Sequence, residues 1–152
     1  MTSFEELTGL IGKYHVDRCV ISANPEPHLT HAWAKECHYW TRIYTAVYLN
    51  DGISKPEWDY RNRRVTVDRT FALNSAYDEI RAGRWWLPPT VREIDNGEFY
   101  AQMKAPTRVR DLSSGQLSYR WTDTGALDHY RHAQAFDHLI GFYRSVPGVW
   151  VV

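Results

Sequence analysis

The stretch Asp17 to Pro27, DRCVISANPEP, decides how the fold is read. Residues Arg18 to Ile21 are typical of a short buried strand, and Pro25 and Pro27 then break the chain. In an α/β protein the end of such a strand faces the ligand crevice, where an enzyme commonly places a charged or nucleophilic group. This chain has Ser22 there. The first question is therefore whether Ser22 belongs to a functional site.

The segments around this strand predict an alternation of helices and strands. Ser3 and Glu6 have the spacing of a capping box at the start of a helix over residues 4–14. A second helix is expected over 29–38 and a second strand over Ile43 to Leu49. Helix, strand, helix and strand in the first fifty residues favour a parallel α/β core.

The rest of the chain predicts shorter elements without an internal repeat or linker, so residues 1–152 are expected to form a single domain. Trp85, Trp86 and Tyr48 are predicted to lie in the core, with base stacking as the alternative reading. The expected elements are a loop or ragged hairpin over 50–64, a strand over Val65 to Val67, a helix from Thr70 to Gly83, a brief strand over Trp85 to Leu87, a helix over 93–103, hairpin strands over 109–112 and 117–122, and a helix over about 128–144.

Composition excludes several classes of protein. The 18 basic and 18 acidic residues give a net charge of zero, so no overall field draws the chain to nucleic acid or membrane. Cys19 and Cys37 do not make a disulfide framework. The sequence has no signal peptide and no run of about 18 apolar residues, so we expect no membrane partner and a cytoplasmic location.

Four arginines, Arg61, Arg63, Arg64 and Arg69, fall within nine positions with only Asp68 against them. Arginine suits bidentate contact with phosphate, so these four are candidate DNA contacts. Two readings compete with this one. A GC-rich genome also raises the arginine content, and Asp68 and Arg69 together are typical of an internal ion pair before a helix.

Three segments resemble one protein family in the order in which they occur. Together they are similar to the C-terminal nuclease domain of the phage terminase large subunit, the motor that packages and cuts viral DNA. The resemblance implies a ribonuclease H-like fold, here a partial α/β core in which a central mixed sheet is flanked by helices and the first strands are missing. It also implies an endonuclease with two Mg²⁺ or Mn²⁺ ions. The segments are FEELTGLIGKYHVDRCVISANPEP, VTVDRTFALNSAYDEIRAGRWWLP and LDHYRHAQAFDHLIGFY.

The resemblance expects three metal-binding acids and finds one in this chain. The acid that opens the last helix corresponds to Asp128, with His129 and His132 beside it. The acid that ends the strand corresponds to Ser22 in VISANPE, and the acid of the opening strand has no counterpart. Because a hydroxyl cannot offset the charge of two divalent cations, we expect the isolated chain to be inactive. Glu26 and Asp123 are carboxylates near these positions, but neither matches the pattern.

Other readings remain open for the same residues. Asp128 also suits the N-cap of the last helix. A zinc site is the alternative for the cysteines and histidines, although they lack the paired spacing of zinc motifs. Such a site would draw on Cys19, Cys37, His28, His31, His129 and His132. For the chain as a whole, the alternative to the terminase resemblance is an unrelated α/β module whose aromatic residues line a small-molecule pocket.

The partners expected from this reading are double-stranded DNA, other packaging proteins of a phage or prophage, and a polypeptide that pairs with the first strand. Without the opening strands, the Arg18 to Ile21 strand would have an apolar edge that proteins rarely leave bare. We expect that edge to be covered by a second copy in a homodimer, by the missing N-terminal part on another chain, or by the segment Val149 to Val152. Two functions follow. In one the chain supplies Asp128 to a composite nuclease site, and in the other it is a non-catalytic module that binds DNA or a packaging partner.

Overall fold

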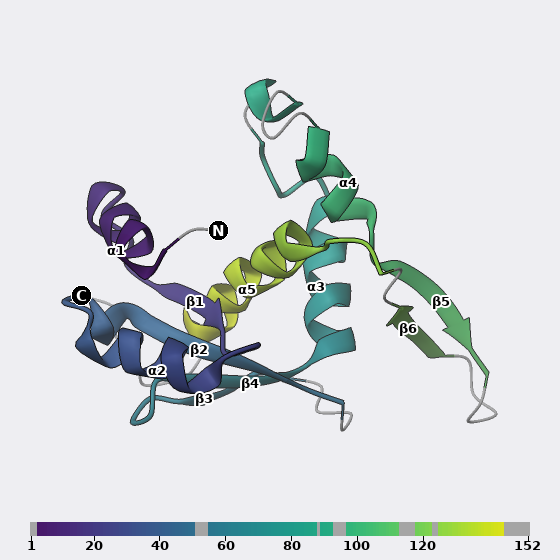
Figure 1. The fold of residues 1–152 in the computed structure, drawn as a ribbon. Coiled ribbons are helices and arrows are strands. Elements are labelled where there is room, and N and C mark those ends of the chain that lie inside the picture. Colours follow the sequence, from purple (N-terminus) through teal and green to yellow (C-terminus); the bar gives the residue numbers. More distant parts are fainter. Residues whose placement is uncertain are drawn as a thin grey trace. The chain divides into compact units, whose positions relative to one another are not determined.

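A computed structural model describes residues 3–50, 55–87, 89–92, 97–112, 118–122 and 125–144. The chain divides into two compact units (Figure 1). Unit 1 contains Met1–Asp68 and Leu139–Val152, and unit 2 contains Arg69–His138. Each unit has fully buried apolar side chains, for example Ile43 in unit 1 and Leu73 in unit 2.

Unit 1 is built on a four-stranded mixed sheet with the strand order β1-β2-β4-β3. The strands are β1 (Cys19–Ser22), β2 (Ile43–Leu49), β3 (Glu57–Asp59) and β4 (Arg64–Asp68). Strands β1, β2 and β4 are parallel, and β3 pairs antiparallel with β4. The predicted α/β class, with a central mixed sheet and helices beside it, is therefore confirmed. The bounds of β2 are those predicted from the sequence.

Two helices of unit 1 precede and follow β1. Helix α1 is Phe4–Lys13 and helix α2 is Pro27–Glu36, with a short 3₁₀ turn, η1 (Trp40–Arg42), before β2. The predicted capping box is confirmed, because Glu6 N donates to Ser3 Oγ at 3.1 Å and Ser3 N donates to the Glu6 carboxylate at 2.7 Å. Pro27 stands in the first turn of α2, where its missing N–H costs no helical hydrogen bond.

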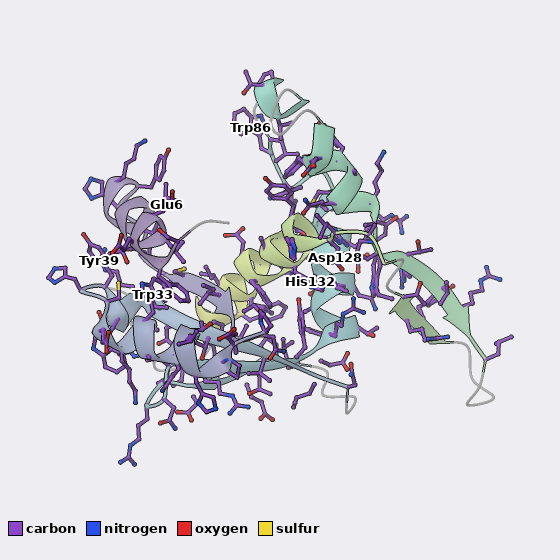
Figure 2. All side chains as sticks on the ribbon, in the orientation of Figure 1. Glu6, Trp33, Tyr39, Trp86, Asp128 and His132 are labelled. Atoms are coloured by element: carbon purple, nitrogen blue, oxygen red, sulfur yellow. The ribbon has the colours of Figure 1, made fainter. Side chains whose placement is uncertain are left out.

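Both helices pack on one face of the sheet. Ile11 of α1, Ala34 of α2 and Ile43 of β2 belong to one buried cluster. Cys19 lies opposite Ile43 in the register of the two strands, so its side chain is on that same face. Burying one such aliphatic side chain contributes about 2 kcal/mol. Trp33 of α2, labelled in Figure 2, packs beside this cluster.

The opposite face of the sheet is also apolar. Tyr44, Val65 and Val67 point to it and are at most 1% exposed. The ring of Trp58 from β3 meets Tyr44 edge-on, with 5.1 Å between the ring centroids. Burial on both faces is the usual state of parallel strands, which explains why β2 and β4 are rich in β-branched residues.

Unit 2 contains helices and a two-stranded antiparallel hairpin, β5 paired with β6. The hairpin strands confirm the prediction from the sequence, while the turn predicted at 113–115 lies outside the described residues. The last helix, α5, contributes its residues up to His138 to unit 2. The elements are α3 (Arg69–Arg81), the 3₁₀ turn η2 (Pro89–Arg92), α4 (Glu98–Lys104), β5 (Thr107–Asp111), β6 (Ser118–Thr122) and α5 (His129–Arg144).

The core of unit 2 includes a buried charge. Arg131 of α5 is 2% exposed, and its guanidinium lies 5.1 Å from the ring centroid of Trp121 and 5.6 Å from that of Tyr77. Its Nη2 donates to the carbonyl of Leu73 at 3.2 Å. The arginine therefore joins α5 to α3 and β6 from inside the unit.

One predicted strand is wrong. Residues Trp85 to Leu87 form no strand, and Trp86 is 80% exposed rather than in the core (Figure 2). Trp85 and Tyr48 are half-buried. A run of three large side chains resembles a strand in composition, but a strand also needs a neighbour to pair with, and local sequence does not reveal one. Asp123 and the predicted strand Val149 to Val152 lie outside the described residues.

Candidate functional site

Asp128, the one acid that the resemblance retains, stands directly before α5 in unit 2. Its Oδ2 is 3.0 Å from His132 Nε2 and 3.9 Å from Arg69 Nη2 (Figure 2 labels Asp128 and His132). The side chains of all three residues are about one fifth exposed. The structure thus adds Arg69, which the sequence singled out separately, to the predicted pair of Asp128 and His132, whereas His129 is exposed on the first turn of α5.

The arrangement gives Asp128 a structural role at the start of the helix. The carbonyl of Asp128 accepts the hydrogen bond from His132 N at 3.1 Å, which begins the helical ladder. Arg69, which faces the carboxylate, also donates from Nη1 to the carbonyl of Trp121 at 3.2 Å. Arg69, at the start of α3, therefore contacts both Asp128 before α5 and strand β6.

Ser22 is the last residue of β1 in unit 1 and pairs with Ala46 of β2. Its Oγ accepts a hydrogen bond from Asn24 N at 3.2 Å, which closes the turn after the strand. The half-buried hydroxyl is neutral and already oriented by this bond. Glu26, two residues beyond Asn24, is exposed at the N-cap of α2. Ser22 and Asp128 belong to different units.

The four arginines divide into two kinds. Arg63 donates from Nη1 to the carbonyl of Thr41 at 2.9 Å and to Tyr44 Oη at 2.8 Å, so its charge is used within unit 1. Arg69 is engaged at Asp128. Arg61 and Arg64 are exposed and remain candidates for contact with a phosphate.

A cavity of about 470 Å³ lies in unit 1 between the first turns of α2 and the sheet. Residues directly opposite one another on paired strands project from the same face, and Thr45, Arg64 and Asp59 form such a row across β2, β4 and β3. All three line the cavity. His28 and His31, three residues apart on α2, line its other side. The sheet and the helix therefore direct polar groups into one space.

Asp59 is the acidic residue of this cavity. Its Oδ1 accepts from Asn62 N at 2.9 Å and its Oδ2 accepts from Asn62 Nδ2 at 2.7 Å. These hydrogen bonds favour the ionised form and hold the pKa of the Asp59 carboxyl below its ordinary value. Arg64 and the two histidines provide the positive or hydrogen-bonding groups around it.

Sequence reasoning missed most of this cavity. The sequence predicts only a loop or ragged hairpin at Asp59 and Asn62, and it places Arg64 in a cluster of arginines. The spacing of His28 and His31 suggests only the alternative of a zinc site. The sequence signal that was present is Asp59 three residues before Asn62, which is typical of a side chain that stabilises a turn.

Both cysteines are free thiols in unit 1. Burial raises the pKa of Cys19 to about 11, and the neighbouring Cys37 contributes in the same direction. A thiol with such a high pKa is a poor nucleophile and a poor source of the thiolate that zinc requires. Over the described ranges, no three residues of the types His, Cys, Asp and Glu are grouped so that they could hold a metal ion.

Comparisons with known proteins identify no relative. No family model matches the chain. No curated protein and no solved structure matches it either. In the part of the chain that the structure describes, none of the helices has the length and apolar character needed to cross a membrane.

Proposed function

We propose that this chain is a terminase-type nuclease-domain protein of a phage or prophage, and that it serves DNA packaging without cutting DNA by itself. The order of its elements supports the proposal. Helix α1, strand β1, helix α2 and strand β2 follow one another, with β1 and β2 parallel, as the resemblance requires after the opening strands. Helix α5 begins directly after Asp128, the position of the retained acid.

The pairing of Asp128 is the observation that carries the inactive reading. Its carboxylate lies next to His132 and Arg69, so two side chains of the protein, rather than a metal ion, already interact with its charge. Two divalent ions at a nuclease centre need several carboxylates, and the resemblance supplies only this one. Ser22 adds a neutral hydroxyl that is engaged with Asn24 N.

Binding of DNA or of a packaging partner is the role that remains for the chain. The exposed Arg61 and Arg64 of unit 1 support contact with phosphate, although the net charge of zero favours a local contact over a long-range field.

A partner strand is part of the same proposal. Strand β1 is the last strand on its side of the sheet formed by the described residues, and its Cys-Val-Ile run carries no charge. The other edge, β3, is short and has Glu57 and Asp59 exposed, which discourages pairing. We therefore expect β1 to pair with a strand from a second copy or from a polypeptide that supplies the opening strands. Light scattering coupled to size-exclusion chromatography tests the first case, and a strict monomer at high concentration contradicts it.

The test of function is calorimetric titration of Mn²⁺ into the wild type and Asp128→Ala, followed by a plasmid-nicking assay on the same samples. Asp137→Ala is the matched control, because Asp137 is an exposed acid on the same helix. We expect the three proteins to give the same weak heat and no nicking. Tight Mn²⁺ binding and nicking that are lost only in Asp128→Ala would refute the inactive reading.

A further inference from the structure

The cavity of unit 1 has a definite chemical character. Its volume of about 470 Å³ falls within the usual range of small-molecule sites, roughly 300–1,000 Å³. The apolar groups of Ala23, Pro27 and Val47 line part of it. A ligand there would meet an apolar wall and a set of hydrogen-bond donors at the same time.

The donors come from two elements and converge on the same space. Arg64 projects from β4, and His28 and His31 project from the first two turns of α2. A guanidinium forms paired hydrogen bonds to the oxygens of a phosphate, and imidazole N–H groups add further donors. Of these three side chains, Arg64 and His28 are exposed, so they are accessible to a ligand from solvent.

The acid in the cavity is already occupied by its own turn. Both carboxylate oxygens of Asp59 accept hydrogen bonds from Asn62. Asp59 therefore does not offer these oxygens to a ligand first, but its negative charge still opposes an anion at short range. Removing the charge of Asp59 should therefore strengthen the binding of an anion in the cavity.

We propose that this cavity binds the phosphate group of a nucleotide, with Arg64, His28 and His31 as its donors and the apolar wall against the nucleoside. The cavity belongs to unit 1 and Asp128 to unit 2, and phosphate binding in the cavity needs neither a metal ion nor cleavage of DNA. Arg64 is shared with the DNA contact proposed above, and titration with the free monophosphate tests the cavity without testing that contact. The nucleotide is either a free deoxynucleoside monophosphate or the 5′-phosphate end of a DNA strand, because both present the same group.

The experiment is an NMR titration of the full chain at one fixed pH and ionic strength. The probes are inorganic phosphate, deoxythymidine monophosphate, deoxythymidine, and a short oligonucleotide with or without a 5′-phosphate. We expect the monophosphate to shift the amide signals of Ala23, Asn24 and Arg64 and the ring signals of the two histidines, and deoxythymidine to leave them unchanged. Binding of only the free monophosphate would identify the free nucleotide, and binding of only the phosphorylated oligonucleotide would identify the DNA end.

Three variants distinguish binding in this cavity from a general attraction of the ligand to positive charge. Arg64→Gln removes a charge-assisted contact and should weaken binding at least about tenfold. Lys35→Gln removes an exposed cation in the last turn of α2 that does not line the cavity, and should change the affinity by less than about twofold. Asp59→Asn removes the opposing charge, keeps an oxygen to accept from Asn62 N, loses the bond from Asn62 Nδ2, and should tighten binding by about fivefold.

Two results would overturn the proposal. One is the absence of any shift at the cavity with the monophosphate or the phosphorylated oligonucleotide in a protein whose spectrum is that of a folded chain. The other is an equal loss of affinity in Lys35→Gln and Arg64→Gln, which would show that binding depends only on the general positive charge of unit 1. Because Arg64 is exposed, its replacement leaves the core untouched and the folded spectrum serves as the check.

Discussion

Alkaline pH should destabilise the protein through one thiol, that of Cys19 in β1. The pKa of Cys19 rises from 9.0, the ordinary value, to about 11 in the folded chain because the thiol is buried. Between these two values the unfolded chain loses the proton while the folded chain keeps it. The folded state therefore binds more protons, and the free energy of unfolding falls as the pH rises through this window.

The size of the effect follows from the same two pKa values. Linkage gives a loss of about 1.3 kcal/mol between pH 8 and pH 10, and a limiting loss of about 2.7 kcal/mol well above pH 11. These are upper values, because Cys19 retains some contact with solvent. Below pH 8 the thiol should contribute no pH dependence.

The assay is urea unfolding of the wild type and Cys19→Ser at intervals from pH 7 to pH 10. A serine hydroxyl does not titrate in this range, so its packing cost is constant while every other titrating group is common to both proteins. We expect the stability of the wild type to approach that of the variant, or fall below it, as the pH rises. A difference that stays constant within about 0.3 kcal/mol would refute the reasoning, because it would mean that Cys19 titrates near its ordinary pKa.

Two further predictions concern packing. Leu73→Ala in unit 2 should lower the free energy of unfolding by about 2–5 kcal/mol because Leu73 is 0% exposed. Leu112→Ala, at a leucine that is 69% exposed, should change it by less than about 0.5 kcal/mol. Chemical denaturation measures both values, and similar losses would contradict the assigned core. In α1, a Cβ on Gly12 would lie 2.8 Å from Tyr39 Oη. Gly12→Ala should therefore stabilise the helix by up to about 1 kcal/mol more in a Tyr39→Phe background than in the wild type. Thermal unfolding of the four proteins measures this difference, and equal effects in both backgrounds would exclude the contact.

The sequence predicted the elements that have strong local signals. The capping box at Ser3 and the β-branched run Ile43 to Leu49 carry their structure in their own residues, and both are confirmed. Strand β3, Glu57–Asp59, has acidic residues and was expected only as part of a loop or ragged hairpin, because its conformation is set by pairing with β4. The strand predicted at Trp85 to Leu87 does not form for the converse reason: its composition favours a strand, but no described strand pairs with it.

The candidate sites follow the same division. The link between Asp128 and His132 lies within one turn of a helix, so spacing alone could bring the two residues to attention. Arg69 joins them from 59 positions away (128 − 69), and no local pattern predicts this contact. The cavity depends on the register of three strands, which places Thr45, Arg64 and Asp59 in one row. Local patterns in a single sequence do not reveal that register.

The unequal edges of the sheet limit how copies of this protein can assemble. Strand β1 offers an apolar edge, while β3 ends in acidic side chains that would repel a like edge. If two copies pair through β1, as proposed above, each molecule has then used the only edge of the described sheet that is suited to strand pairing. Such an assembly would stop at a dimer, because a filament needs two pairing edges on every molecule. The acidic side chains of β3 would in that case prevent further growth.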